Sequence, residues 1–271
     1  MIRRTPRVVV MIPARYDSSR YPGKPLVPLR GCTGEPKPLI RRSWEAAMRV
    51  EGVHEVYVVT DHDTIAETAR GFGAQVVMTS ADCRNGTERC AEALDRLGEV
   101  PDLVVNLQGD APLTPPHFVT ALIDSLSEAE EASVATLAIR CDAGHYAALR
   151  TDELAGRVGG TTVVTDSRQR AFYFSKRLIP WFPASRDSGR ETPVRLHLGV
   201  YAYTPDALAA YRAEPPFELE RLEGLEQLRF LELGLPIQVV EVQPPEWEIW
   251  ELNNPSDVEP VERGLALAGI A

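Results

Sequence analysis

A loop rich in cations follows the first apolar stretch of the chain, within Val8–Pro25. The loop begins after Pro13 and carries Arg15, Arg20 and Lys24. A buried strand before it would place these cations and the loop's backbone N–H groups at the carboxyl end of a sheet. Open α/β sheets usually bind anionic ligands at that end. We therefore interpret the loop as a polyphosphate cradle, with a solvated basic loop as the alternative; its glycine spacing is not that of a Walker A loop.

Two further loops that follow predicted strands carry polar side chains. Thr60–Asp63 is most simply an N-cap, because Thr and Asp suit the position before a helix. In Cys83–Arg89 the Asn-Gly pair predicts a turn. That turn would deliver Thr87 and Arg89 to the same crevice as the cradle, where they could contact a base or a phosphate.

A third loop, Asn106–Asp110, ends a strongly apolar strand. A carboxylate such as Asp110 at this point can hold Mg²⁺, which bridges the phosphate oxygens of a nucleotide. Glycosyltransferases that use a preformed nucleotide sugar share this kind of sheet but normally carry an Asp-x-Asp motif here. Gln108 occupies the first position of that motif, which disfavours a glycosyltransferase.

Strands and helices alternate through residues 1–140. Such alternation predicts βαβ units and a mostly parallel sheet flanked by helices. The strands are almost wholly apolar, as expected when helices cover both faces. The expected strands are Val8–Ile12, Val56–Thr60, Gln75–Met78, Leu103–Leu107 and Val134–Ile139, and the expected helices are Leu39–Val50, Thr64–Phe72, Glu88–Leu97 and Pro116–Leu126.

The alternation is lost after residue 140. We expect residues 1–140 to form a nucleotide-binding α/β core and 141–205 a smaller mixed or antiparallel insertion for acceptor binding and dimerisation. Residues 206–271 would return to the core. The later elements expected are short strands at Thr161–Thr165, Ala171–Ser175, His197–Tyr203 and Ile237–Val242, and helices at Leu222–Leu233 and Ser256–Ala268.

Composition narrows the class of protein. The chain has 271 residues, 44% hydrophobic and 25% charged, as in ordinary globular proteins. A net charge of −10 argues against nucleic-acid or membrane partners. Four cysteines without metal-ligand spacing fit reduced thiols, and no targeting or membrane-spanning segment is evident, so we expect a cytoplasmic protein.

Several segments, in order and spacing, resemble one family, that of the 3-deoxy-manno-octulosonate (Kdo) cytidylyltransferases. The resemblance extends over roughly residues 8 to 263, and the opening loop and LEQLR are its specific parts. These segments are VVVMIPARYDSSRYPGKPL, NGTERCAEAL, VVNLQGDAPL, RAFYFSKRLIPW, HLGVYAY, LEGLEQLRFLELG and NNPSDVE.

The resemblance implies a glycosyltransferase-A-like sheet and transfer of CMP from CTP to a 2-keto sugar acid, with Mg²⁺ as cofactor and release of pyrophosphate. It also implies a homodimer. The implied catalytic residues are Arg15, Lys24 and Asp110, and the implied metal ligands are Asp110 and Asn253. The implied nucleotide-binding residues are Ala14, Ser18, Ser19, Asn85, Gly86, Arg89 and Gln108. The implied acceptor-binding residues are Lys176, His197, Tyr201, Glu226 and Gln227.

The chain departs from the family's pattern at four positions. Ala111 stands where the family has Glu, and Asn253 where it has a second metal-binding Asp. An amide oxygen can bind Mg²⁺ but brings no negative charge. Lys176 replaces an acceptor-facing Arg, so a point charge replaces a bidentate fork. Thr162 stands in place of a basic residue.

These departures leave the acceptor open. One hypothesis is Kdo or a related sugar acid. Another is a different small anion such as phosphonoformate, because the CTP-side motifs persist while the acceptor side changes. A third is a nucleotide-binding protein that has lost catalysis, although the retention of Arg15, Lys24 and Asp110 argues against it.

Overall fold

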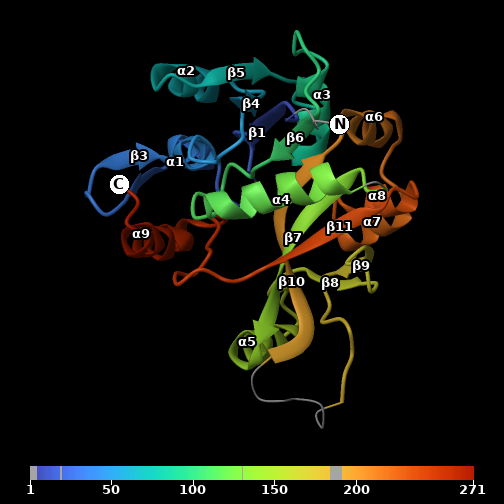
Figure 1. The fold of residues 1–271 in the computed structure, drawn as a ribbon. Helices are drawn as coiled ribbons and strands as arrows, with labels where there is room; N and C mark the ends of the chain where they lie inside the picture. Colours follow the sequence, from blue (N-terminus) through green and yellow to red (C-terminus); the bar gives the residue numbers. More distant parts are fainter. Residues whose placement is uncertain (1–4, 19, 130, 184–190) are drawn as a thin grey trace. The chain divides into compact units, whose positions relative to one another are not determined.

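The structure is a computed structural model that describes residues 5–18, 20–129, 131–183 and 191–271. The chain forms two compact units, each described by itself below. The first comprises Met1–Ile123 and Pro244–Ala271, and the second comprises Asp124–Gln243. The chain passes from one unit to the other within helix α4 (Pro116–Glu128) (Figure 1).

A parallel sheet forms the centre of the first unit. Its strands lie in the order β6-β1-β4-β5, with every neighbouring pair parallel. Strand β1 is central and apolar, and Val10 pairs with Val56 on one side and Val105 on the other. The four strands are β1 (Val8–Ala14), β4 (Glu55–Thr60), β5 (Gln75–Met78) and β6 (Leu103–Asn106).

Helices connect these strands, as parallel pairing requires. They are α1 (Leu39–Ala47), α2 (Asp63–Gly71) and α3 (Gly86–Leu94). Between β1 and α1 the chain forms a short 3-10 helix, η1 (Lys24–Leu26), and a small antiparallel pair, β2 (Pro28–Arg30) and β3 (Pro36–Pro38).

The last residues of the chain complete the first unit. They contain the 3-10 helix η3 (Pro255–Asp257) and helix α9 (Val258–Leu267). One apolar cluster joins them to the amino-terminal part, because Leu252 and Leu265 pack with Leu29 and Leu39, all of them fully buried. The carboxyl-terminal segment is therefore fixed beside α1.

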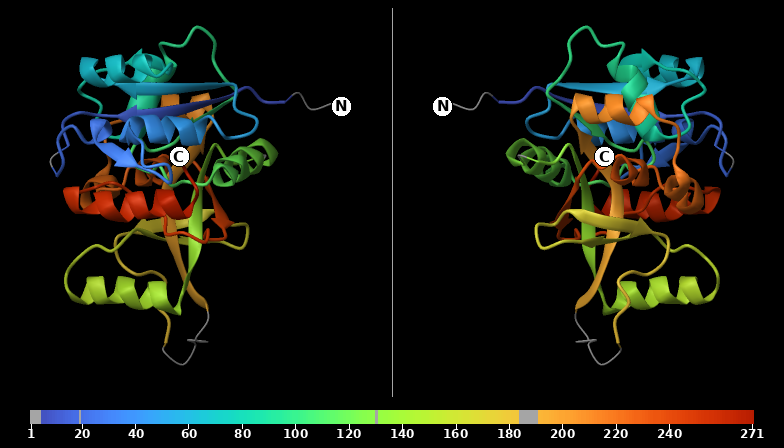
Figure 2. Two further views of the ribbon diagram at one scale, coloured as in Figure 1. Left: turned by 90° about the vertical axis from the view of Figure 1, so that its left-hand side faces the viewer. Right: turned by 90° about the vertical axis from the view of Figure 1, so that its right-hand side faces the viewer.

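The second unit contains a mixed sheet. Strand β7 (Val134–Asp142) pairs in parallel with β11 (Ile237–Val242) and antiparallel with β10 (Glu191–Tyr203). Strands β7 and β10 run side by side in both views of Figure 2. The remaining elements are β8 (Thr162–Thr165), β9 (Ala171–Ser175), α5 (Ala143–Leu154), α6 (Pro205–Ala213), α7 (Glu218–Glu223) and α8 (Leu228–Glu232).

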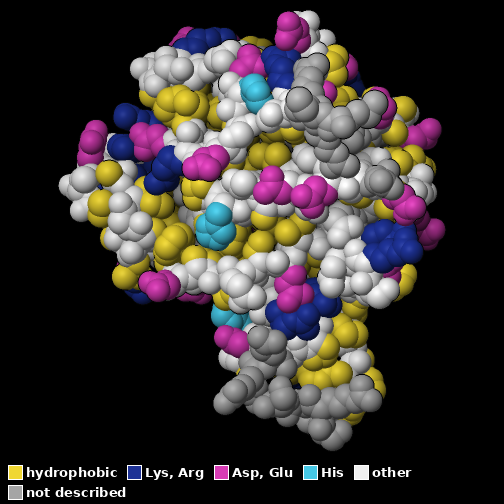
Figure 3. All heavy atoms as spheres, viewed as in Figure 1, with side chains coloured by type: hydrophobic (Ala, Val, Ile, Leu, Met, Phe, Trp, Pro, Cys, Tyr) yellow, Lys and Arg dark blue, Asp and Glu magenta, His cyan; other side chains and the backbone are white. Residues whose placement is uncertain are grey.

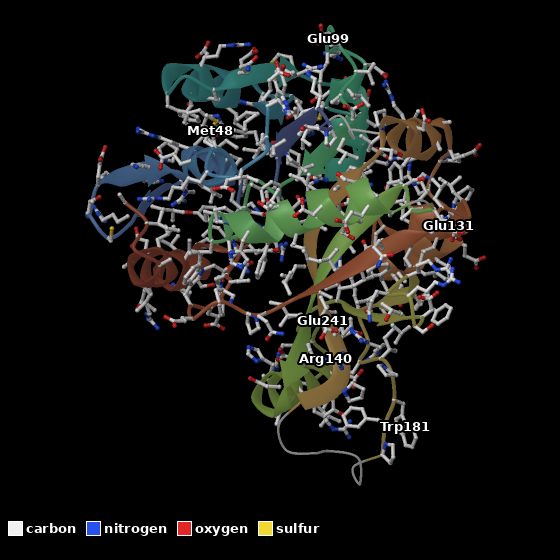
Figure 4. All side chains as sticks on the ribbon, viewed as in Figure 1. Met48, Glu99, Glu131, Arg140, Trp181 and Glu241 are labelled. Atoms are coloured by element: carbon white, nitrogen blue, oxygen red, sulfur yellow. The ribbon has the colours of Figure 1, made fainter. Side chains whose placement is uncertain are left out.

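An ion cluster links three strands of this unit. Glu241 on β11 accepts hydrogen bonds from Arg140 on β7, at 2.9 Å, and from Arg195 on β10, at 2.7 Å. Figure 4 shows Arg140 and Glu241 close together. Burial by itself would raise the pKa of Glu241, but the hydrogen bonds and charges of the two arginines outweigh it and hold that pKa below its ordinary value.

The predicted fold class is confirmed: a mostly parallel sheet flanked by helices, with a smaller mixed and antiparallel part. The bounds of the two units differ from the division expected at residues 140 and 205. Strand β7 ends near residue 140 but is paired with β10 and β11, so it belongs with them.

The helices expected in the second unit were wrong in one case and incomplete, since α5 and α6 were not expected. The helix expected over Leu222–Leu233 is two helices, because Gly224 ends α7 in the left-handed conformation at φ 63°. Helix α5 buries none of its residues, so its sequence lacks the apolar periodicity that would reveal it.

The surface carries charges of both signs. On the face that Figure 3 shows, acidic and basic side chains of the described residues are interspersed with apolar ones. Among those residues, every helix is too short or too polar to cross a bilayer.

Candidate functional site

The cation-rich loop leaves β1 and folds back on itself. Arg15 follows the last residue of the strand and is exposed. Gly23 donates its N–H to the carbonyl of Tyr16 at 2.9 Å and adopts φ 70°, a conformation that favours glycine. This turn starts η1 at Lys24. Residues nine positions apart in sequence, Arg15 and Lys24, therefore border one crevice.

The loop after β6 lies directly against the end of β1. A Cβ on Gly109 would lie 2.7 Å from the carbonyl oxygen of Pro13, so only glycine allows this approach. The Gly109 carbonyl accepts a hydrogen bond from the Ser43 hydroxyl at 2.9 Å. The carbonyl of Asp110 accepts one from the Leu252 N–H, also at 2.9 Å. Helix α1 and the carboxyl-terminal segment thus fix Asp110 from two sides.

Two polar pairs cross the crevice. The Lys24 ammonium lies 2.6 Å from Asp110 Oδ2, and both side chains are largely shielded from solvent. The Arg20 guanidinium donates to Asn253 Oδ1 at 2.8 Å. Cations from the first loop therefore contact both predicted metal ligands. These oxygen atoms attract positive charge, and oxygen donors are those that Mg²⁺ prefers.

The amino end of α3 forms another wall. Asn85 caps the helix by accepting the Glu88 N–H at 2.8 Å. A Cβ on Gly86 would lie 3.2 Å from the Gln108 amide, so the helix start and the β6 loop are in close contact. The first N–H groups of a helix and its dipole favour an anion.

Arg89 is held rigidly beside this wall. Its guanidinium is buried and donates to Thr79 Oγ1 at 2.6 Å and to Asp61 Oδ2 at 3.0 Å. Asp61 therefore anchors Arg89 and does not cap α2, although the loop Thr60–Asp63 does contain the N-cap residue. The N-cap of α2 is His62, without a side-chain hydrogen bond to the helix.

The structure brings the predicted nucleotide and metal residues together in one crevice of about 320 Å³. Ser19 lies outside the described residues. Thr87 is fully buried and does not line the crevice. The predicted residues among the lining are Ala14, Arg15, Ser18, Arg20, Lys24, Asn85, Gly86, Arg89, Gln108, Asp110 and Asn253.

Two lining residues, Cys83 and Arg84, had not been singled out from the sequence. Arg84 adds a cation, paired with Glu88 at 2.8 Å. Burial and a hydrogen bond to Glu92 raise the pKa of Cys83 to about 11, so its thiol stays neutral. In the sequence, only the position of Cys83 and Arg84 just before Asn85 could have indicated that they line the crevice, because cysteine and arginine are not distinctive residues in a loop.

The departures at Ala111 and Thr162 have structural consequences. Ala111 is buried and does not line the crevice, so the described crevice keeps its acid at Asp110. Thr162 is buried as well and donates its hydroxyl to the Arg177 carbonyl at 2.5 Å, which gives it a structural contact in place of a charge.

The predicted acceptor residues all lie in the second unit. Tyr201 donates its hydroxyl to Gln227 Oε1 at 3.2 Å. The other amide atom, Gln227 Nε2, is buried and has no hydrogen-bond partner among the described residues. Lys176 lies beside the turn that precedes Glu226, since a Cβ on Gly224 would be 3.1 Å from the Lys176 ammonium.

His197 adjoins the same group of residues. Its ring contacts the ring of Tyr201, with 5.5 Å between the centroids, and its Nε2 is 2.9 Å from Thr136 Oγ1. Burial lowers the pKa of His197 to about 3, so the imidazole is neutral near pH 7. It can exchange a hydrogen bond with a ligand but cannot supply a charge.

Comparisons with known proteins agree on one kind of enzyme. A family model described as "Cytidylyltransferase" matches residues 9–237. The 3-deoxy-manno-octulosonate cytidylyltransferase of Maricaulis maris is 40% identical over 97% of this chain and 98% of its own. The 8-amino-3,8-dideoxy-manno-octulosonate cytidylyltransferase of Shewanella oneidensis is 41% identical over 96% and 99%. A solved CMP:2-keto-3-deoxy-manno-octonic acid synthetase complexed with CTP superimposes with a TM-score of 0.80 at 33% identity, covering 95% of this chain and 97% of that one.

Proposed function

The chain belongs to the cytidylyltransferase family, and from this membership we propose that it transfers CMP from CTP to Kdo or its 8-amino analogue, with release of pyrophosphate. The observation that carries the proposal is the single crevice shared by Arg15, Lys24 and Asp110 at the carboxyl ends of β1 and β6. Anionic ligands of open α/β sheets bind at such a place.

The cations of the crevice suit the triphosphate of CTP. Arg15, Arg20 and Lys24 would bind and orient the phosphates, and the amino end of α3 would contact the nucleoside side. Attack on the α-phosphorus requires positioning and charge neutralisation more than covalent catalysis. A serine or cysteine nucleophile is therefore not needed, which agrees with the neutral thiol of Cys83.

Asp110 and Asn253 would hold Mg²⁺. Their oxygen atoms fit this ion, and the contacts of Lys24 and Arg20 with these same atoms indicate that they favour positive charge. When bound, Mg²⁺ would neutralise charge that develops on the phosphate oxygens. Lys24 would then be released from Asp110 to contact phosphate.

The acceptor would be recognised by the second unit. Lys176 would attract the carboxylate of the sugar acid, and the buried Gln227 Nε2 would donate to one of its oxygens. An unsatisfied buried donor is costly, so a ligand oxygen at this point would stabilise the complex. His197 would contribute a neutral hydrogen bond.

The phosphonoformate hypothesis has no support from the relatives, whose names specify octulosonate acceptors. Membership in a cytidylyltransferase family likewise gives no support to the hypotheses of a protein that has lost catalysis or of a glycosyltransferase. Assembly as a homodimer and a cytoplasmic location stay predictions.

Pyrophosphate release measures the proposed reaction directly. The protein is incubated with CTP and Mg²⁺ and with Kdo or 8-amino-Kdo in separate reactions, and the formation of the CMP-sugar is confirmed by mass spectrometry. We expect release that depends on the sugar acid and is far weaker with ATP, GTP or UTP. Release with neither acceptor would refute the proposal.

A further inference from the structure

Tyr16 lies where the cation-rich loop folds back on itself. Its carbonyl accepts the N–H groups of Ser18, at 3.0 Å, and of Gly23, at 2.9 Å. Its ring lies against the same glycine, since a Cβ on Gly23 would be 3.5 Å from atoms of the ring. Two cations of the crevice flank this fold, because Arg15 directly precedes Tyr16 and Lys24 directly follows the glycine. The position of Tyr16 therefore determines where both cations leave the backbone.

The ring of Tyr16 stacks on the imidazole of His62, which lies between β4 and α2. The ring centroids are 4.1 Å apart and the ring planes differ by 15°. The His62 side chain does not cap α2, and its buried Nδ1 atom has no hydrogen-bond partner among the described residues. An unpaired buried polar atom costs stability. The contact that accounts for a flat ring at this position is thus the stack on Tyr16.

The backbone of His62 is fixed on both sides. Its N–H donates to Thr60 Oγ1 at 3.3 Å, and its carbonyl accepts the Ala66 N–H at 3.1 Å. The preceding residue, Asp61, accepts a hydrogen bond at 3.0 Å from the buried guanidinium of Arg89. Arg89 belongs to α3 and lines the crevice. His62 is therefore a rigid platform that is tied to the α3 wall and supports the cation-rich loop.

We propose that His62 is a positioning residue for nucleotide binding. By stacking on Tyr16 it holds the cation-rich loop in the conformation in which Arg15 and Lys24 border the crevice. This inference deepens the proposed function and rests on it. Neither Tyr16 nor His62 is among the residues that line the crevice, so both act on CTP through the loop. Without the stack the loop adopts its binding-competent conformation for only a fraction of the time, and the apparent affinity for CTP falls by that fraction.

Binding of CTP to the full chain, measured by isothermal titration calorimetry without an acceptor, tests the assignment. A stacked aromatic pair changes an equilibrium constant by up to about tenfold, so we expect His62→Ala to weaken CTP binding by about three- to tenfold. His62→Phe keeps a flat ring on Tyr16 and should bind CTP within about twofold of the wild type. The matched control is His117→Ala, which removes an exposed histidine of α4 and should leave binding unchanged.

A double-mutant cycle shows whether the effect passes through the stack. Tyr16→Leu should also weaken CTP binding, and Tyr16→Leu combined with His62→Ala should weaken it no more than Tyr16→Leu alone, because both changes remove one contact. Wild-type affinity in His62→Ala, equal weakening in His62→Phe, or additive effects in the cycle would overturn the assignment. If Tyr16→Leu does not fold, the two His62 variants decide it.

Steady-state kinetics separate positioning from a general loss of structure. In His62→Ala the KM for CTP should rise while kcat stays within about twofold, whereas a loss of folded protein would lower kcat and leave KM unchanged. The second pattern would also overturn the assignment. The wild type's pyrophosphate release, measured separately, decides the proposed function, so the two failures are distinguishable. Circular dichroism confirms that each variant is folded.

Discussion

The Lys24 ammonium and the Asp110 carboxylate are in direct contact, at 2.6 Å, although 86 residues separate them in sequence. One comes from the loop after β1 and the other from the loop after β6. Each group neutralises the other's charge. Binding of a triphosphate and a cation would give each group a separate partner.

Replacement of Lys24 by alanine tests the phosphate side of this pair. We expect kcat/KM for CTP to fall by about 10²- to 10³-fold, as when one preorganised donor is removed from a site of developing charge. Steady-state kinetics with CTP varied would measure it. The matched control is Arg263→Ala, which removes an exposed cation of α9 and should leave kcat/KM unchanged. Unaltered CTP kinetics in Lys24→Ala would contradict the cradle interpretation.

Replacement of Asp110 by asparagine tests the metal side. The substitution keeps the shape of the side chain but removes its charge, and we expect turnover to fall by at least about a thousandfold, or roughly 4 kcal/mol of transition-state stabilisation. The pair with Lys24 is partly exposed, so the melting temperature should fall by only about 2–4 °C. Normal turnover in this variant at saturating Mg²⁺ would refute the assignment of Asp110.

Gly109→Ala tests the close approach of the β6 loop to β1. The new Cβ would lie 2.7 Å from the Pro13 carbonyl oxygen, so the loop and Asp110 must shift. We expect a loss of activity of about a hundredfold, because small displacements of catalytic groups are costly. Gly71→Ala is the control, since a Cβ on Gly71 would enter open space. Equal activity of the two variants would show that the approach is unimportant.

Glu241→Gln tests the ion cluster of the second unit through its dependence on pH. The pKa of folded Glu241 is below its ordinary value of 4.5, so the stabilisation is complete above that value and is lost as the pH falls through the lower pKa of the folded state. At pH 7 we expect the variant to lose about 1–2 kcal/mol of the free energy of unfolding. Urea unfolding at pH 7 and near pH 3 measures this, and the difference should shrink at the lower pH.

The control for this measurement is Glu131→Gln. Glu131 also pairs with an arginine, Arg170, at 3.3 Å, but its side chain is 70% exposed. An exposed pair of this kind contributes little, so the free energy of unfolding should change by less than about 0.5 kcal/mol. A loss as large as that of Glu241→Gln would indicate that burial of the cluster is irrelevant.

The sequence was sufficient to predict the first sheet and most of its crevice. Apolar strands such as β1 and β6 end abruptly, and parallel strands bring their carboxyl ends to one edge, so Lys24 and Asp110 had to converge. The cationic Lys24 and the acidic Asp110, each in the loop after an apolar strand, were enough to predict binding of phosphate and Mg²⁺ before their contact was known.

Other features depend on contacts that the sequence does not encode locally. The apolar pattern continues through Gly224, so it predicted one helix where the structure has two. Helix α5 buries none of its residues, so no apolar periodicity revealed it.

The order in which the chain is made has a consequence for this site. Because Leu252 and Asn253 come far after Asp110 in the chain yet complete the same unit, a nascent polypeptide that does not yet include them lacks the hydrogen bond from Leu252 to Asp110. The crevice is then completed only after these residues have been made, and shorter chains would not consume CTP.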